Sequence, residues 1–270
     1  MQLKHRVALD DVQLDSVDDR IMISKIETGD GKENIQLASL WGEVAGSRVT
    51  SMHRDSLDIT VKFRIRLKKR DMKEREEVIE KVNAWAFAGG WLTTNYKTNR
   101  RIRVFRAQAA TAGDPWEWTK EYAVVFRACG VPYWQEEEPN SVQKLNVSSA
   151  SLVMGVNGSE KTVLEADFKN TSGNTCNTFM IGVANTNISM SFSSLGLANG
   201  ETLVIDHDDN GKRCNLRLRI RSTGGSYRSV MNKRTALSSD DLTISPGTRT
   251  VSFAAQTTGQ ITVRCRGRFA

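Results

Sequence analysis

The sequence predicts a mainly β protein with one main α-helix, divided into two domains. Apolar and polar residues alternate over several segments, a helical period occurs once, and from about Asn146 onward short alternating runs are separated by turn residues. A period of two places the apolar side chains of a strand on one face of a sheet. The 270 residues, 39% hydrophobic and 26% charged, are typical of a globular protein with one large or two modest domains.

The clearest predicted strand runs from Leu57 to Leu67, where apolar residues occupy every odd position. Full burial of Phe63, Ile65 and Leu67 would contribute roughly 1.5 to 3 kcal/mol for each side chain. A shift of register by one residue would expose this row, so the pattern specifies the pairing of the strand strongly.

The helical period covers about residues 71 to 88 and predicts an amphipathic helix. Asp71 is a suitable N-cap, Glu74 follows three residues later as in a capping box, and Gly89-Gly90 supplies the stop. The apolar stripe comprises Met72, Val78, Ile79, Val82, Trp85 and Ala86, with Arg75 as its one polar interruption. We interpret the stripe as core packing against a sheet rather than as a groove for a partner or cofactor.

Two further alternating runs follow the helix. The first is Arg101 to Phe105, and the second extends over about residues 116 to 127. One face of the second run carries Trp116, Trp118, Tyr122, Val124 and Phe126 with Lys120 as an exception, and the other carries Glu117, Thr119, Glu121 and Arg127. Both runs are typical of strands with one buried side.

A change in composition predicts the domain boundary. All the tryptophans lie in the first half: Trp41, Trp85, Trp91, Trp116, Trp118 and Trp134. The segment Gln135 to Ser141 is polar, contains Pro139 and shows no apolar period, so we interpret it, with Glu136 to Glu138, as a solvated linker. The predicted domains are therefore residues 1–139 and 140–270.

Short strands and explicit turns predict an all-β sandwich for the second domain. The candidate strands are Ser151 to Val156, Lys161 to Phe168, Thr178 to Ala184, Ile188 to Phe192, Glu201 to Asp206, Cys214 to Arg221, Thr248 to Ala254 and Gln260 to Arg266. The candidate turns are Asn157-Gly158, Asn199-Gly200, Asn210-Gly211, Pro246-Gly247 and Thr258-Gly259.

The net charge of +7 belongs mainly to the second domain. Residues 1–142 carry 23 Lys and Arg against 22 Asp and Glu, and residues 143–270 carry 15 against 9. Three rows of cations alternate with other residues: Lys62, Arg64 and Arg66; Arg217, Arg219 and Arg221; Arg264, Arg266 and Arg268. Such rows could contact phosphates, but the solvated face of an antiparallel sheet is polar in any case, and we favour a solvated or protein-facing role.

The sequence predicts no catalytic residues, no cofactor site and no metal site. Asp206, Asp208, Asn210 and Gly211 match the opening of a calcium loop, but Arg217 occupies the twelfth position, where a Glu is required, so a polar hairpin turn is the better interpretation. His5, His53 and His207 are interpreted as surface residues, and the sequence contains no nucleophile elbow, zinc-protease helix or phosphate-binding glycine loop. The widely separated Cys129, Cys176, Cys214 and Cys265 are expected to be free, buried thiols.

Targeting signals are also missing from the sequence. No segment approaches the ~20 apolar residues that a transmembrane helix needs, and the residues from Met1 to Arg6 lack the apolar run of a signal peptide. We therefore expect a protein that is made and assembled in the cytoplasm.

The order of these features resembles the distal tail protein family of long, non-contractile-tailed phages. The first half combines an early strand at Ile21 to Glu27, a turn at Gly46-Ser47, the strand and helix described above, Gly89-Gly90-Trp91-Leu92, the strand at Arg101 to Phe105, and Glu121 to Ala128 before Pro132-Tyr133-Trp134. The second half contributes Gly200 to Asp206 and Leu242 to Gly247.

The resemblance implies an N-terminal ring-forming, β-sandwich-like domain with the helix, and a C-terminal galectin-like β-sandwich. It implies a structural virion protein, located at the tail tip, whose homohexameric ring joins the tail tube to the tail-tip hub. The implied partners are further copies of the chain, the tail tube protein, the hub or tail-associated lysin-type protein and the tape measure protein. DNA would only pass through the channel, and no membrane would be involved.

Two other functions and one structural hypothesis remain open at this stage. The second domain could be a carbohydrate-binding module for host-surface glycans, although its only aromatic residues are Phe168, Phe179, Phe192, Tyr227, Phe253 and Phe269. An enzyme acting on cell wall is a third candidate. The first twenty residues are polar and acidic and show no clear strand, so we interpret them as an arm that orders on assembly.

Overall fold

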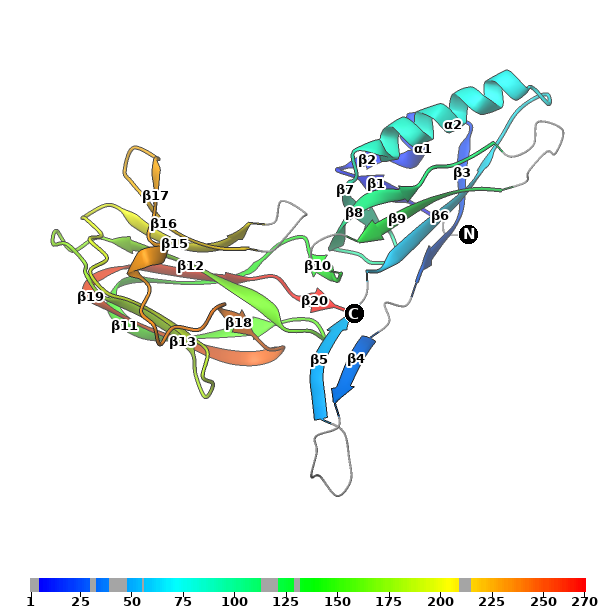
Figure 1. The fold of residues 1–270 in the computed structure, drawn as a ribbon. Coiled ribbons are helices and arrows are strands. Elements are labelled where there is room, and N and C mark those ends of the chain that lie inside the picture. Colours follow the sequence, from blue (N-terminus) through cyan, green and yellow to red (C-terminus); the bar gives the residue numbers. More distant parts are fainter. Residues whose placement is uncertain are drawn as a thin grey trace. The chain divides into compact units, whose positions relative to one another are not determined.

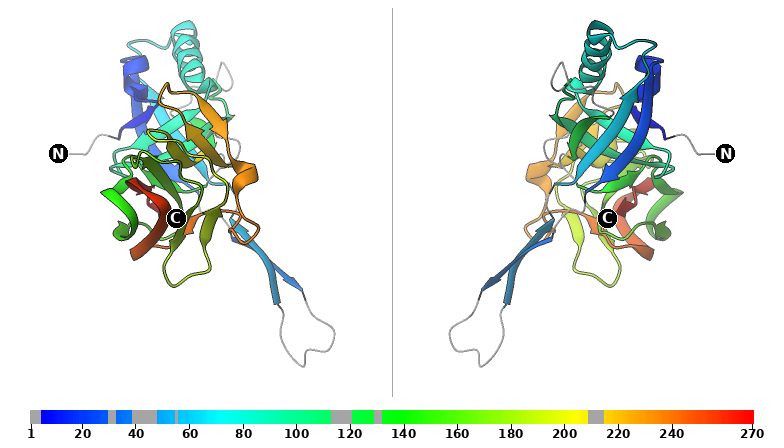
Figure 2. Two further views of the ribbon diagram at one scale, coloured as in Figure 1. Left: turned by 90° about the vertical axis from the view of Figure 1, so that its left-hand side faces the viewer. Right: turned by 90° about the vertical axis from the view of Figure 1, so that its right-hand side faces the viewer.

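The computed structural model of the chain describes residues 5–29, 33–38, 48–54, 56–112, 121–128, 132–208 and 215–270, with the backbone alone for 33–38 and 48–54. The chain divides into two compact units, Met1–Tyr133 and Trp134–Ala270. Strands dominate both units (Figures 1 and 2). The predicted β-rich fold class is therefore confirmed.

The first unit is built on one antiparallel sheet that carries a helix on one face (Figure 1). The strands follow the order β2-β1-β7-β8-β9-β6-β3. Their bounds are β1 Val7–Leu9, β2 Val12–Gln13, β3 Ile21–Thr28, β6 Asp58–Ile65, β7 Gly90–Thr94, β8 Arg100–Gln108 and β9 Tyr122–Ala128. Two further strands, β4 Glu33–Ala38 and β5 Arg48–Arg54, pair with each other as a separate hairpin.

Strand β6 confirms the alternation that predicted it. Ile59, Val61 and Phe63 are fully buried, and in the register of the sheet they lie opposite Phe126, Val124 and Tyr122 of β9. The strand is shorter than predicted, because it ends at Ile65 rather than Leu67. The side chains of Ile65 and Leu67 are only partly buried. Trp116, Trp118 and the predicted turn at Gly46-Ser47 lie outside the described residues.

Helix α2, Met72–Phe87, matches the predicted helix closely. The helix buries four residues of the predicted stripe, Val78, Ile79, Val82 and Ala86. One detail of the stripe was wrong, since Met72 is 43% exposed. Arg75, the polar interruption of the stripe, is completely buried with the apolar side chains.

The N-cap of α2 provides a first testable prediction. The carboxylate of Asp71 accepts hydrogen bonds from the backbone N–H groups of Lys73 at 2.8 Å and Glu74 at 3.2 Å. The Asp71→Ala substitution leaves both donors without this acceptor, so we expect a loss of about 1 kcal/mol in the free energy of unfolding. Urea unfolding followed by tryptophan fluorescence measures the loss, and Asp71→Asn, which keeps an acceptor oxygen, should recover most of it.

The N-terminal residues are part of the folded first unit, so the interpretation of the first twenty residues as an arm was wrong over the part that the structure describes. β1 pairs with both β2 and β7, and a short helix, α1 Leu14–Val17, follows. Val7, Leu9 and Leu14 are buried in the core. The acidic residues between them occupy the turns, where Asp10 and Asp11 adopt positive φ, and these turns mask the alternation.

The boundary between the units lies at Tyr133/Trp134 rather than at Pro139. Strand β10, Trp134–Glu136, pairs with the C-terminal strand β20, Arg268–Phe269, which binds it to the second unit. The segment interpreted as a linker is ordered as β10 and the start of β11. Glu136 accepts hydrogen bonds from the side chain of Asn157 at 2.7 Å and the N–H of Gly267 at 2.9 Å, so it is a structural residue.

The second unit is a β-sandwich with a shared pair of long strands, β11 Asn140–Val156 and β19 Gly247–Cys265. The other strands are β12 Thr162–Asn170, β13 Phe179–Val183, β14 Ser189–Phe192, β15 Thr202–Asp208, β16 Asn215–Arg221, β17 Tyr227–Ser229 and β18 Thr243–Ile244. A short 3-10 helix, Met231–Lys233, lies between β17 and β18.

Each long strand contributes to both layers of the sandwich. The first half of β19 pairs with β13, its second half pairs with β12, and β11 runs beside it throughout. Irregularities between Lys144 and Ser149 bend β11, and Asn140 and Gly155 from its two ends are joined by a hydrogen bond. One layer therefore consists of β14, β13, the first half of β19 and the second half of β11, and the layers enclose a core that includes Phe168, Phe179 and Phe253.

The predicted turns are correct at three positions and wrong at one. Gly158, Gly200 and Gly247 have φ values of 109°, 82° and 98°, which only glycine adopts without strain. Thr258-Gly259 is not a turn but part of β19, so two predicted strands are one. Asn210-Gly211 lies outside the described residues.

Candidate interaction surfaces

The first sheet has a second face, opposite α2, that combines cations with aromatic residues. By the alternation of the strands, this face carries Trp91 of β7, Arg101 and Arg103 of β8, Phe105 of β8 and Arg127 of β9. The guanidinium carbons of Arg101 and Arg103 lie 4.1 Å and 5.7 Å from the ring centroid of Trp91. Phe105 is 44% exposed. Aromatic and arginine side chains of this kind are enriched in protein interfaces.

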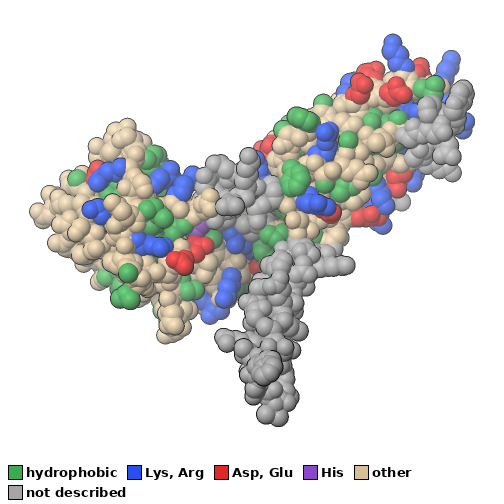
Figure 3. Space-filling view, in the orientation of Figure 1, with side chains coloured by type: hydrophobic (Ala, Val, Ile, Leu, Met, Phe, Trp, Pro, Cys, Tyr) green, Lys and Arg blue, Asp and Glu red, His purple; other side chains and the backbone are tan. Residues whose placement is uncertain are grey.

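Acidic partners balance several of the cations on the same face. Lys62 pairs with Glu27 at 2.9 Å, Arg127 with Asp58 at 2.7 Å and Arg64 with Glu121 at 3.7 Å. The row Lys62, Arg64 and Arg66 is thus partly neutralised within the chain. The space-filling view likewise shows acidic and basic side chains interspersed over the first unit (Figure 3).

A charged groove of about 510 Å³ lies at the start of α2, lined by Asp19, Arg20, Arg66, Leu67, Lys68, Lys69, Asp71 and Glu74. Arg20 of this lining binds Asp18 at 2.8 Å, Asp18 also binds Lys81 at 3.1 Å, and the Asp18 side chain is only 5% exposed. The hydrogen bonds from Arg20, despite the opposing effect of burial, hold the pKa of Asp18 well below its usual range, and Lys81 adds to the effect. Asp18 therefore stays ionised and ties the N-terminal segment to α2.

This network could not be identified from the sequence. Asp18 and Lys81 are separated by 63 positions, and neither belongs to a recognisable motif. The charges along the exposed face of α2, including Glu77 paired with Lys81 at 2.8 Å, complete a surface of mixed sign.

Three of the six arginines in the two rows of the second unit bind acidic residues of the same sheet. Arg217 and Arg219 both bind Asp206, at 3.0 Å and 2.6 Å, and Arg264 binds Asp167 at 2.9 Å. Arg219 also stacks on Tyr227 at 4.3 Å. Arg266 donates to the backbone carbonyls of Glu136 and Glu137. These contacts favour the solvated or protein-facing role over phosphate binding.

Asp206, the first residue of the possible calcium loop, is already held by those two arginines. Asp208 ends β15, and Asn210 and Gly211 lie outside the described residues. Within the described ranges, no group of three or more His, Cys, Asp and Glu side chains could hold a metal ion.

His207 is buried, so its interpretation as a surface residue was wrong. Its side chain is 2% exposed, and its Nε2 lies 2.6 Å from Oδ1 of Asp241. Burial acts to raise the pKa of Asp241, but the contact with His207, the N–H of Leu242 and the charge of Arg268 together outweigh burial and lower it. The pair joins β15 to the segment before β18. His5 is partly buried and contacts Tyr96, and the side chain of His53 is not described.

The two described cysteines match the prediction of free, buried thiols. Cys176 and Cys265 are unpaired and buried. Burial raises the pKa of Cys265 to about 11, which keeps its thiol protonated and unreactive at neutral pH. Cys129 and Cys214 lie outside the described residues.

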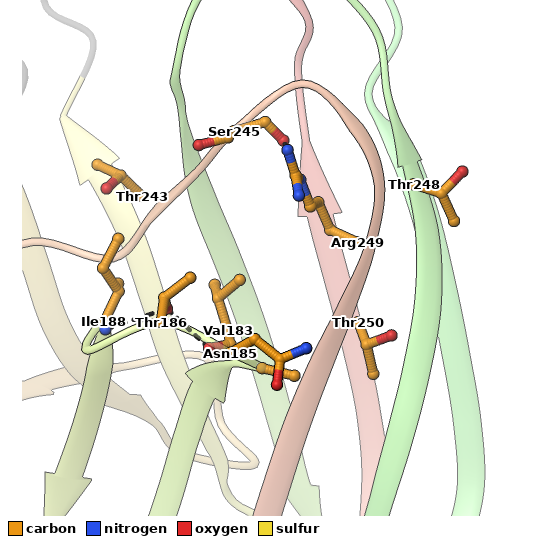
Figure 4. Close-up of a pocket in the computed structure, with 10 residues that line it drawn as sticks. Val183, Asn185, Thr186, Ile188, Thr243, Ser245, Thr248, Arg249 and Thr250 are labelled. Carbon is orange, nitrogen blue, oxygen red and sulfur yellow. Dashed lines mark hydrogen bonds between the residues drawn. The ribbon is translucent and has the colours of Figure 1, made fainter.

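A small pocket at one end of the sandwich has a volume of about 210 Å³ (Figure 4). Its lining comes from the β13–β14 turn, the segment around β18 and the start of β19. Arg249 turns toward the loop that carries Ser245 and donates to the carbonyls of Ser245 and Pro246. Thr186 bonds the carbonyl of Val183 at 2.7 Å. These groups hold the turns together, so the pocket has a structural explanation.

The aromatic side chains of the second unit give little support to glycan binding. Phe168, Phe179, Phe192 and Phe253 are buried in the core, where Phe168 and Phe179 lie 5.1 Å apart. Tyr227 is half exposed but is covered on one face by Arg219.

Across the described residues, no helix is long and apolar enough to span a membrane.

Comparison with known proteins gives matches among solved structures. No family model and no curated protein sequence matches the chain. The crystal structure of the Dit protein of phage SPP1, described as a paradigm of the hub adsorption apparatus in phages that infect Gram-positive bacteria, matches with a TM-score of 0.71 and 12% identity. The match covers 98% of this chain and 99% of that chain. The chain has the fold of a phage distal tail protein.

Two structures of the phage P2 baseplate in its activated conformation, with Ca and with Sr, match less well. Their TM-scores are 0.49 and 0.47, with 8% and 7% identity. The alignments cover 99% and 97% of this chain, and 98% and 97% of the matched chains. The SPP1 match by itself covers both units of this chain, and its fold agrees with the order of features in the sequence.

Proposed function

We propose that this protein is a structural component of a phage tail tip, an adaptor that forms a homohexameric ring between the tail tube and the tail-tip hub. The observation that carries the proposal is the SPP1 Dit match at a TM-score of 0.71 over 98% of the chain, because it includes both units rather than one common sandwich. The first unit forms the ring, and the galectin-like second unit faces outward.

The mechanism is geometric and uses no catalytic residue. A closed heterologous ring buries one patch of each subunit against a different patch of the next. Its two rims then present separate surfaces to the tube and to the hub, and its centre leaves a channel through which DNA passes. The tail-tip partners are the tube protein, the hub or tail-associated lysin-type protein, and the tape measure protein. The protein is located in the virion after assembly in the host cytoplasm.

The surfaces of the first unit support a subunit interface. The arginines stacked on Trp91 and the exposed Phe105 lie on the sheet face that α2 leaves uncovered, while α2 carries carboxylates on its exposed side. Charged and aromatic groups in these positions can set the orientation of neighbouring copies.

The mass of the purified full chain in solution tests the proposal. We expect light scattering to find a species whose mass is six times the 30.1 kDa of the chain, or a whole multiple of that hexamer mass. We expect negative-stain images to show a ring with a central hole. The measurement is repeated with the hub protein added. The proposal is contradicted if the chain forms no hexamer or multiple of a hexamer, either alone or with the hub protein.

A further inference from the structure

The layer that contains β14, β13, β19 and β11 has two edges of different character. At the β14 edge, the segment 233–239 covers the strand. Ser189 donates to Oγ of Ser239 at 3.0 Å and accepts from the N–H of Ser239 at 2.7 Å. Ser191 donates to Oγ of Ser238 at 2.9 Å and accepts from the N–H of Thr235 at 2.9 Å. This edge cannot accept another strand.

At the opposite edge, the second half of β11 pairs on one side only, with β19. Val153 lies opposite Thr250, whose carbonyl accepts from Ala184 on the β13 side at 2.9 Å. Thr250 therefore turns its backbone groups away from β11. In an antiparallel ladder, the residue opposite must then turn its own N–H and C=O outward, so Val153 presents them to the open edge.

The neighbouring odd-numbered residues of β11 have their backbone groups in the same orientation as Val153. Gly155 confirms it, since its carbonyl accepts from the side chain of Asn140 rather than from β19. Ser149, Ser151 and Val153 consequently direct their backbone groups outward. Among the residues that the structure describes, none bonds to the outward groups of Ser151 and Val153.

This edge also lacks the usual protection against pairing. Edge strands are normally short, bulged, charged or interrupted by proline. The stretch from Ser148 to Val156 contains neither a charge nor a proline, and its register with β19 is regular from Ser149 onward, although the side chain of Asn140 occupies the outward carbonyl of Gly155 near its end. The edge strand of the other layer, β17, is only three residues long and carries Arg228. Val153 is 61% exposed at the centre of the unprotected edge.

We propose that this edge of β11 pairs with the same edge of a second copy of the chain, antiparallel and about a two-fold axis. The segment is complementary to itself, because the outward groups recur at every second residue and no like charges meet. With Leu152 opposite Leu152 of the second copy, Ser151 lies opposite Val153. The side chains of Ala150, Leu152 and Met154 then fall on the core face in both copies, so the two layers form one continuous sheet.

This contact does not depend on the ring proposed above and multiplies its mass by two. The test compares the full-length wild type with Val153→Lys by light scattering over a range of concentrations. The substitution adds a charge to an exposed side chain and leaves the core intact. The wild type is expected to show a mass of two or twelve chains, and Val153→Lys a mass of half that value at every concentration.

Met180→Lys is the matched control. Met180 is 47% exposed on β13, on the same face of the same layer but away from the edge, so its charge should leave the mass unchanged. An equal mass for the wild type and Val153→Lys overturns the pairing, whether the ring is present or not. An edge that accepts only a strand of a different protein gives this result too. A wild type that forms dimers but no hexamers or dodecamers would instead contradict only the ring.

Amide hydrogen exchange provides a second readout that monomer folding does not affect. The N–H groups of Ser151 and Val153 should exchange slowly at high protein concentration and faster on dilution or in Val153→Lys. The proposal would be contradicted if these two N–H groups exchanged at the same fast rate, without protection, at every protein concentration.

Discussion

The Gly259→Ala variant should lose about 3 kcal/mol or more of the stability of the second unit. A Cβ atom at position 259 would lie 2.4 Å from the carbonyl oxygen of Lys169 and 2.6 Å from two ring atoms of Phe168. Overpacking of a core typically costs ~1–3 kcal/mol, and occasionally more. The upper end is expected here because one of the clashing atoms belongs to the paired backbone of β12 and cannot rotate away, and because Phe168 is held by Phe179 and Phe253.

Differential scanning calorimetry of the full chain measures this effect, with Gly155→Ala as the matched control. Gly155 is also a strand glycine of the second unit, but a Cβ there meets no atom within 4 Å, so this variant should be neutral or slightly stabilising. Tryptophan fluorescence, which arises mainly from the five tryptophans before residue 134, should report an unchanged first unit. Equal transition temperatures for the two variants would contradict the prediction.

Gly259 also explains why one part of the sandwich could not be predicted. A Thr-Gly pair between two alternating runs is a normal signal for a turn. Glycine in a strand can instead mark a close approach of another backbone, and the sequence contains nothing that distinguishes the two cases. The carbonyl of Lys169, far away in the chain, decides the outcome.

Elements with a strong local period were predictable. The alternation at Ile59, Val61 and Phe63 and the stripe of α2 each identify a strand or helix from neighbouring residues alone. The short strands β1, β10 and β20 have no such period, because each contains only two or three residues and depends on a partner distant in sequence. The misplaced domain boundary and the misinterpreted N-terminal segment both result from this dependence.

The surfaces were less predictable than the fold. The polar faces of the arginine rows follow from alternation, but the pairing of Arg217 and Arg219 with Asp206 depends on the register between β15 and β16. The contact of the buried His207 with Asp241 joins residues 34 positions apart, and Asp241 lies in a segment without a periodic pattern. The contrast between the covered β14 edge and the open β11 edge requires the full hydrogen-bond topology.

Replacement of Asp18 should destabilise the first unit by ~2–3 kcal/mol at neutral pH. Removal of one partner from a buried ion pair typically costs ~3–5 kcal/mol. The lower value is expected because Arg20 and Lys81 are 25% and 42% exposed, so water partly solvates them when Asp18 is lost. Asp18→Asn is the preferred variant, since it removes the charge and retains the shape, and Asp19→Asn is the control because Asp19 is exposed.

The same variant predicts a specific dependence on pH. The pKa of Asp18 is lower in the folded than in the unfolded chain, chiefly through the hydrogen bonds from Arg20. Its contribution to stability is therefore fully present above its unfolded pKa of about 3.9 and is lost as the pH falls toward the folded pKa. The difference in unfolding free energy between wild type and Asp18→Asn should be constant from pH 7 to about 5 and should shrink progressively below about pH 4. Denaturant titrations with tryptophan fluorescence measure it, and a difference that stays constant down to pH 2.5 would show that Asp18 acts through packing rather than through its charge.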